Sequence, residues 1–203
     1  CDKLVAVDVV GGNPTYASQD GVLFNKTKTN LIRCPEGKKQ SYAIPDGVTG
    51  IENHAFYRCQ RLETVTIPDG VTSIGTDAFS ECTGLTAITI PGSVTTIGHK
   101  AFSECTELTG ITIPLGVTAI GASAFTGCIN LKKVTIGESV TSIGTAAFSE
   151  CKNLTNMEVL GRAIPEGVDV FKNSPTVIYF MPGAQGWAPV WNERFVRPIS
   201  DKP

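Results

Sequence analysis

The sequence predicts an α/β solenoid, mostly β, in which coils of 23 residues wind into a right-handed superhelix and stack on one another. Three observations support this prediction. An Ala-Phe pair recurs every 23 residues, apolar residues recur at fixed distances behind it, and proline and glycine interrupt each unit at the same places. Because one unit cannot bury its apolar side alone, the units are expected to stack like on like.

The recurring unit reads C-x-x-L-x-x-[VI]-T-I-P-x-[GS]-V-T-x-I-G-x-x-A-F-x-x. Its phenylalanine column consists of Phe56, Phe79, Phe102, Phe125 and Phe148. Its cysteine column consists of Cys59, Cys82, Cys105, Cys128 and Cys151. Leucine, valine and isoleucine fill the other apolar positions, and stacking at about 4.8 Å per coil would join all of these columns into one continuous core.

Each unit is expected to contain two extended segments and one turn. In Leu62–Ile67, inward apolar residues alternate with outward Thr66, as in a short half-buried strand. Pro68 ends this strand because proline cannot donate to a continuing ladder. Val71–Ile74 forms a second extended segment, Gly75 is expected to turn the chain, and the Ala-Phe segment is expected to form one tight helical or 3₁₀ turn.

Two rows of threonine are expected on the outside of the stack. One consists of Thr66, Thr89, Thr112 and Thr135, and the other of Thr49, Thr72, Thr95, Thr118 and Thr141. Identical β-branched residues pack well beside one another in a parallel ladder, which favours a structural role for both rows. An ice-binding or glycan-binding array is the functional alternative.

The repeat resembles the BspA-like leucine-rich repeats of bacterial surface and secreted proteins, which share the C-x-x-L-x-x-[VI]-x-[IL]-P and I-G-x-x-A-F-x-x-C signatures. Full copies extend from about Tyr42 to Leu154. Asp20–Asn25 and Asn30–Pro35 resemble the hairpin-like insert of this family, and Val177–Gly183 resembles its closing segment. The resemblance implies a leucine-rich-repeat horseshoe or arc that serves adhesion or protein recognition, outside the cell or at its surface.

We expect a single domain over residues 1–203. It divides into a first partial repeat (1–19), a hairpin-like insert (20–35), regular repeats (36–158), and a degenerate last repeat with a C-terminal cap (159–203). Cys1, Leu4 and Val7 fall in the register of the C-x-x-L-x-x-V strand, so the sequence is expected to begin inside a repeat. A lipidated Cys1 is the alternative.

The C-terminal residues suggest an aromatic cap. Trp187, Trp191 and Phe195 recur every four residues, which is the spacing of one helix face. We expect this helix to cover the open end of the core, and an aromatic platform for a ligand is the alternative.

The chain has seven cysteines, five of them in the 23-residue column. Stacked coils would bring neighbouring cysteines within disulfide range, but five cannot all pair and their side chains would point in parallel. We interpret the column as buried, protonated thiols without a catalytic role. The short C-x₂₋₄-C spacings of zinc sites are absent.

Little in the sequence indicates catalysis or a cofactor. The two histidines, His54 and His99, occupy positions that vary freely between repeats, and no phosphate-binding loop or dinucleotide motif is present. A net charge of −2 gives no basic footprint for nucleic acid, and no apolar run approaches the roughly 20 residues that span a bilayer. We therefore expect neither an enzyme nor a binder of metal, cofactor or nucleic acid.

Partner contacts are expected at outward positions that differ between repeats. The candidates are Arg61, Glu63, Lys132, Lys133, Lys152 and Trp187. The three lysines fall at or beside neighbouring positions of adjacent coils and would form a basic spot for an acidic partner, although a merely solvated surface is the alternative.

The preferred function is a monomeric, non-catalytic interaction or adhesion module at the cell surface or outside the cell, which binds a protein or glycan. A structural spacer in a larger surface protein is the alternative.

Overall fold

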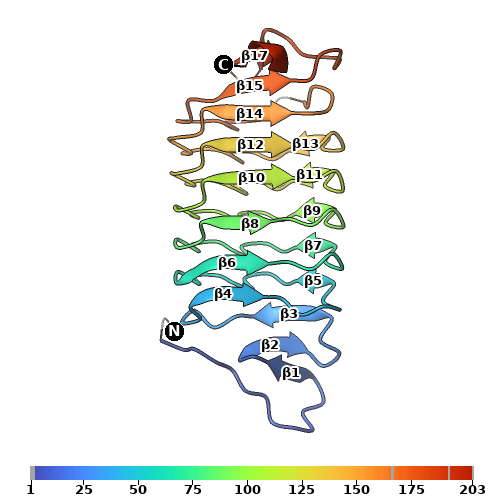
Figure 1. Ribbon diagram of the computed structural model, residues 1–203, viewed down its shortest axis with the longest axis vertical. Helices are drawn as coiled ribbons and strands as arrows, with labels where there is room; N and C mark the ends of the chain where they lie inside the picture. The colour runs from blue at the N-terminus through green and yellow to red at the C-terminus, as the bar shows by residue number, and fades with distance from the viewer. Residues whose placement is uncertain (1–2, 166, 192, 203) are drawn as a thin grey trace.

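The computed structural model describes residues 3–165, 167–191 and 193–202. The chain forms an elongated stack of coils, with two sets of short strands running along its length (Figure 1). Regular structure is almost entirely β, as the sequence predicts, and the one helix in the described residues is the 3₁₀ helix η1 (Ile199–Asp201). The predicted solenoid is therefore confirmed.

The L-x-x-[VI]-T-I segments form one side of the stack, which we call the strand face. Its strands are β4 (Gln40–Ala43), β6 (Leu62–Thr66), β8 (Ala87–Thr89), β10 (Gly110–Ile113), β12 (Lys133–Ile136), β14 (Asn156–Val159) and β15 (Val177–Phe180). They are parallel and largely keep the 23-residue register, so that Thr112 lies opposite Thr135. The ladder runs from β4 to β8 and again from β10 onward, but β8 and β10 are not paired.

The V-T-x-I segments form the second sheet. Its repeat strands are β5 (Gly50–Ile51), β7 (Ser73–Ile74), β9 (Thr96–Ile97), β11 (Ala119–Ile120) and β13 (Ser142–Ile143). The insert extends this sheet with β1 (Tyr16–Gln19), β2 (Val22–Asn25) and β3 (Asn30–Arg33), of which β3 pairs with β5 in parallel. The insert is thus a three-stranded unit that begins before the expected residue 20.

The Ala-Phe segments are not the helical turns that we expected. Each is a series of hydrogen-bonded turns, in which the Tyr57 N–H donates to the His54 carbonyl at 3.1 Å. The neighbouring Phe56 N–H instead points along the stack and donates to Ala78 O of the next coil at 2.7 Å. Left-handed residues make this alternation possible, with φ of 60° at His54 and 62° at Arg58. Bonding between coils therefore replaces bonding within a helix.

The repeated glycines have a different role from the one predicted. Gly98 and Gly121 do not have the left-handed backbone that would require glycine in a turn. A Cβ added at Gly121 would instead lie 2.5 Å from the Gly98 carbonyl carbon, and one at Gly98 would lie 2.6 Å from the Gly75 carbonyl carbon. Glycine is needed because successive coils approach too closely for a side chain.

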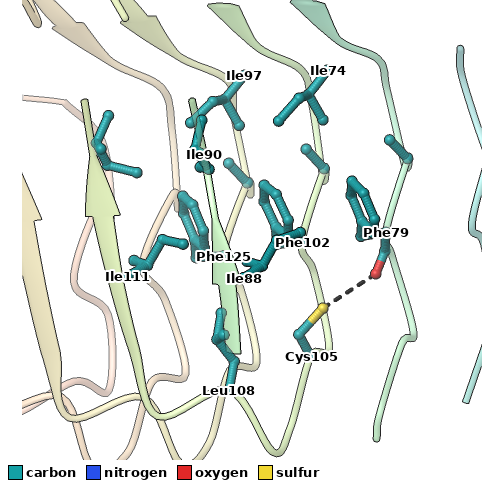
Figure 2. Close-up of a cluster of buried hydrophobic side chains, with 14 of the residues drawn as sticks. Ile74, Phe79, Ile88, Ile90, Ile97, Phe102, Cys105, Leu108, Ile111 and Phe125 are labelled. Carbon is teal, nitrogen blue, oxygen red and sulfur yellow. Dashed lines mark hydrogen bonds between the residues drawn. The ribbon is translucent and has the colours of Figure 1, made fainter. Parts of the chain in front are cut away.

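The core consists of the apolar columns that the repeat predicts. All five phenylalanines of the column and Phe171 are buried, and neighbouring rings from Phe56 to Phe148 stack with centroids 4.7–5.2 Å apart. Figure 2 shows Phe79, Phe102 and Phe125 in this parallel arrangement between the two sheets. Leucine, isoleucine, valine and cysteine columns surround the rings.

The N-terminal segment departs from the predicted partial repeat. Residues 4–10 form no strand, and Leu4 is 46% exposed, so it does not occupy the buried leucine position of a coil. The segment is held by backbone bonds from Gly37 to Leu4 and from Val7 to Gly21, both 2.8 Å long. Cys1, for which a repeat position or lipidation was considered, lies outside the described residues.

The predicted C-terminal helix is wrong. β16 (Val190–Trp191) and β17 (Arg194–Pro198) form an antiparallel hairpin, and β17 also pairs with β15. Trp191 is 4% exposed and meets Phe171 edge-on with centroids 5.8 Å apart, whereas Phe195 is 67% exposed. A turn at Glu193, with φ of 60°, brings the two strands together, so the four-residue spacing does not correspond to one helix face.

The phenylalanine column predicts a position-dependent loss of stability. Replacing Phe102 by Ala should lower the free energy of unfolding by about 3–5 kcal/mol because the cavity lies between two rigid neighbours. Phe171→Ala should have a smaller effect, since its ring stacks at a wider 5.9 Å on Phe148 and Trp191 can move into the space. Urea unfolding measures both, and equally small losses would contradict a stacked core.

Candidate interaction surface

Small neutral side chains occupy most of the strand face. Its outward residues from β4 to β10 are exposed or half-buried, and the ladder aligns them in rows along the stack. One row contains Thr64, Ala87, Gly110 and Lys133, and the next contains Thr66, Thr89, Thr112 and Thr135. These two rows are therefore uncharged until they reach β12.

The other threonine row is held by its own hydroxyls. Thr72 Oγ1 donates to Thr49 O at 3.1 Å, Thr95 Oγ1 donates to Thr72 O at 3.1 Å, and Thr118 and Thr141 continue the series. The backbone N–H groups of the same residues donate to the same carbonyls. Because these hydroxyl protons are already engaged, the arrangement supports the structural interpretation of this row.

The three candidate lysines are all exposed, but their surroundings differ. Lys133 Nζ lies 3.2 Å from Glu158 Oε2. Lys132 precedes β12, Lys152 lies in the turn before β14, and neither forms an ion pair within the described part of the chain. In the predicted basic spot, one lysine is therefore paired with a carboxylate, and the other two have no carboxylate partner among the described residues.

Glu158 is an acidic centre that the sequence analysis did not identify. It is 9% exposed on the strand face, and it accepts hydrogen bonds from Lys202 and from Thr135 Oγ1 in addition to its pairing with Lys133. Burial disfavours its charged form, but the hydrogen bonds from Lys202 and Lys133 outweigh that effect and lower the pKa of the carboxyl. Lys202 also lies over the Tyr179 ring, so the C-terminal segment folds back onto this end of the strand face.

Arg61 and Glu63 lie together near the other end of the strand face. Both are exposed, and with Lys39 and Gln40 they line an open hollow of about 500 Å³. The two predicted residues thus share a site, which has mixed charge and is some coils away from the lysines.

Trp187 does not form the exposed platform that was considered as an alternative. It is half-buried, stacks on Phe180 with ring centroids 5.9 Å apart, and meets Trp191 edge-on at 5.8 Å. Its indole Nε1 is buried without a hydrogen-bond acceptor among the described residues. Trp187 therefore belongs to the packing of the C-terminal end.

A hollow of about 360 Å³ opens where β8 and β10 are not paired. Its walls are Ile88, Thr89, Ile90, Gly110, Ile111, Thr112, Lys133 and Thr135. This site was not predicted from the sequence, although one signal for it was present. Gly110 occupies a row in which Thr64, Ala87 and Lys133 carry side chains, and glycine weakens a strand.

The cysteine column lies in the core, and its thiols hydrogen-bond to the backbone. Cys105 Sγ donates to Phe79 O at 3.2 Å (Figure 2), and Cys82, Cys128 and Cys151 make the equivalent contact. Burial raises the pKa of the Cys105 thiol well above its ordinary value and that of Cys151 to about 12. The six described cysteines are free and buried, in agreement with the sequence interpretation.

The ionisable residues near the Ala-Phe turns are dispersed. His54 Nε2 lies 3.7 Å from Asp77 Oδ2, and Arg58 Nε lies 3.1 Å from Glu81 Oε2. Among the described residues, no three histidine, cysteine or acidic side chains converge as metal ligands. Nor do those residues include a helix long and apolar enough to cross a membrane.

Sequence comparison identifies the family. Residues 34–155 match the BspA type leucine-rich-repeat region in six copies, which is more than half of the chain. The protein therefore belongs to the BspA-type leucine-rich-repeat family. A search of curated protein sequences finds no significant match.

Several solved bacterial structures are similar to this chain. The pneumococcal vaccine antigen PcpA has 25% identity and a TM-score of 0.76 over 96% of this chain and 50% of its own. A leucine-rich cell surface protein from Faecalibacterium prausnitzii has 39% identity and a TM-score of 0.69 over 73% of this chain and 40% of its own. A leucine-rich repeat protein from Eubacterium ventriosum has 25% identity and a TM-score of 0.66 over 95% and 57%. This chain thus spans only part of each of them.

The thiol contacts predict different effects for two small substitutions. Cys105→Ala removes the thiol donor from the buried Phe79 carbonyl, which keeps only the Cys82 N–H at 3.2 Å, and the lost hydrogen bond should lower the free energy of unfolding by about 0.5–1.5 kcal/mol. Cys105→Ser should have a smaller effect, because Ser174 already makes the equivalent contact with Phe148 O at 2.7 Å. Urea unfolding compares the two variants, and an equal loss for both would contradict a role for the hydrogen bond.

The raised thiol pKa values predict loss of stability in alkali. In the folded chain Cys82, Cys105 and Cys128 remain protonated where the unfolded chain, with an ordinary pKa of 9.0, releases its protons. The folded state then binds more protons, so the free energy of unfolding should fall as the pH rises above about 9 and lose nothing from these groups below about 8. Urea unfolding across this range measures the slope. The triple alanine variant should have a shallower slope, and an unchanged one would contradict the assignment.

Proposed function

We propose that the protein is a non-catalytic interaction module, located at the bacterial cell surface or outside the cell, that contacts its partner through the strand face. The observation that carries the proposal is the exposure of this face: from β4 to β10 its outward side chains lie open to solvent or half-open. A partner can therefore reach a flat row of neutral side chains and, beyond it, the lysines near β12.

Charge indicates which part of the strand face contributes most. Lys132 and Lys152 are exposed without a carboxylate partner in the described chain, so an acidic partner gains their full attraction. Lys133 contributes less to this long-range attraction because it is paired with Glu158, which also pairs with Lys202 and so leaves a net positive charge on the group. Such exposed charges mainly increase the rate of association and discriminate between partners.

Two further observations support the location and the lack of catalysis. The similar Faecalibacterium prausnitzii structure is that of a cell surface protein. The cysteines, which would be the strongest nucleophiles, are buried and protonated in the part of the chain that the structure describes. A spacer that binds nothing would have the same core, but it would not require exposed lysines, unpaired in the described chain, such as Lys132 and Lys152 on the strand face.

The proposal is tested by measuring capture of extracellular host proteins by the immobilised chain. We expect a saturable protein partner, whose affinity falls by at least about tenfold when Lys132 and Lys152 are both replaced by Glu. The matched control is Lys100→Glu with Lys172→Glu, which makes the same change of charge beside the Ala-Phe turns.

Equal losses in both variants would show that overall charge, and not the strand face, determines binding. If no protein is captured at saturating concentration, the protein-binding role is wrong, and the spacer function replaces it if the chain binds no saccharide either.

A further inference from the structure

The strand-face ladder is interrupted at one place while the second sheet continues. β8 pairs only with β6, and β10 pairs only with β12, yet β9 and β11 on the second sheet remain paired in register, with Ala119 opposite Thr96. The two coils therefore remain hydrogen-bonded through the second sheet and are unpaired on the strand face. The result is the hollow of about 360 Å³ on the strand face, which lies near the lower end of the range of about 300–1,000 Å³ for ligand sites.

The geometry of the hollow excludes an inserted peptide strand. Strands in a ladder lie about 4.8 Å apart, so a strand added between β8 and β10 would have to double their separation. The intact pairing of β9 with β11 prevents that opening. The occupant must instead enter from the outer face and be compact.

The walls of the hollow combine three kinds of contact. Thr89, Thr112 and Thr135 carry hydroxyls; those of Thr89 and Thr112 can donate and accept a hydrogen bond, whereas Thr135 Oγ1 donates to Glu158 and can only accept another. Ile88 and Ile111, which are 8% and 5% exposed, form a small apolar base beneath these hydroxyls. A Cβ added at Gly110 would meet only the Lys133 carbonyl oxygen, at 3.6 Å, which means that the space above this residue is open.

The charge around the rim is net positive, because Lys133 and Lys202 share the single carboxylate of Glu158. Lys133 lines the hollow, its side chain is 52% exposed, and no carboxylate is among the lining residues. Glu158 occupies one direction of its ammonium group, which has three donors, so further hydrogen bonds can be directed toward a ligand. Lys132, immediately beside it, adds a second positive charge near the rim.

We infer that this hollow binds one acidic sugar unit of an anionic polysaccharide. The sugar hydroxyls would exchange hydrogen bonds with the threonines, its apolar ring face would cover Ile88 and Ile111, and its carboxylate or sulfate would face Lys133. The inference rests on the proposed function, for which it specifies a class of partner.

The first test uses three defined tetrasaccharides in calorimetric titrations with the whole chain. A galacturonic acid tetramer supplies carboxylates, a heparin-derived tetramer supplies sulfates, and maltotetraose is neutral. We expect saturable binding of at least one charged tetramer and affinity at least about tenfold weaker for the neutral one. Comparison of the two charged probes identifies which acidic group is recognised.

The second test fills the hollow. Gly110→Thr places a side chain in the open space at a strand position that Thr64 occupies two coils earlier, so the fold should be retained, and affinity for the charged tetramer should fall by at least about tenfold. Ala87→Thr adds the same side chain in the same row, but Ala87 does not line the hollow, and affinity should be unchanged. Gly110→Ala, a smaller filling, should have an intermediate effect and replaces the threonine variant if that one unfolds.

The third test separates specific from general charge. Lys133→Gln should remove most of the preference for charged over neutral sugar, whereas Lys132→Gln, the same loss of charge one residue away, should remove less of it. The salt dependence of binding, measured in parallel, should fall with Lys133→Gln.

Three outcomes would overturn the inference. They are no binding of either charged tetramer, binding that Gly110→Thr and Gly110→Ala leave unchanged, and equal binding of an acidic peptide with the same dependence on residue 110. None of these affects the proposed function, whose test is capture of a host protein and its dependence on Lys132 and Lys152. Conversely, if no host protein is captured but the charged tetramer still binds, the proposal of a protein partner is rejected and the saccharide site is retained.

Discussion

The fold depends on backbone hydrogen bonds between successive coils, and these bonds require a constant coil length. In the Ala-Phe turns, the N–H of Phe79 reaches Ala101 O at 2.7 Å, just as Phe56 reaches Ala78 O. The same coils must also keep register in both sheets. An insertion inside one coil would disturb all three sets of bonds at once, which explains why the one large insertion precedes the regular coils and forms its own strands. Close approach at Gly98 and Gly121 follows from the same stacking.

The ends of the stack lack the donors that a further coil would supply, and arginines take their place. Along the interior, the phenylalanine carbonyls accept from cysteine thiols and finally from Ser174. At the C-terminal end Arg194 Nη2 donates to Phe171 O at 2.6 Å. At the N-terminal end Arg33 donates to the carbonyls of His54 and Tyr57. A guanidinium has several donors on one rigid plane, so it can satisfy carbonyls that a backbone would otherwise reach.

The sequence predicts the structural features that recur in every coil, but it does not predict those that occur at only one place in the chain. The buried columns, such as Phe102 and Cys105, were predictable because every coil imposes the same inward contacts. The left-handed residues His54 and Arg58 were not, because nothing in their side chains requires that backbone. The four-residue spacing of Trp187, Trp191 and Phe195 predicts a helix, but it also fits a hairpin whose turn lies between Trp191 and Phe195. For the candidate site, the positions of Lys132 and Lys152 followed from the register, but Glu158 became important only when the C-terminal segment brought Lys202 to it.

The same constraint explains where this chain can acquire a specific site. Inward residues are committed to packing, and the hydroxyls of the Thr72 row are committed to the backbone, so neither can recognise a partner without loss of stability. Outward residues are not required for packing, but a flat row of small side chains has no concave surface that a partner can recognise. A hollow forms where the strand pairing is interrupted. The interruption lies beside Gly110, between two coils that remain paired in the second sheet. The interruption leaves polar and apolar surface accessible within a rigid frame, next to Lys133 of β12, and a rigid frame limits the entropy that is lost when a ligand is bound.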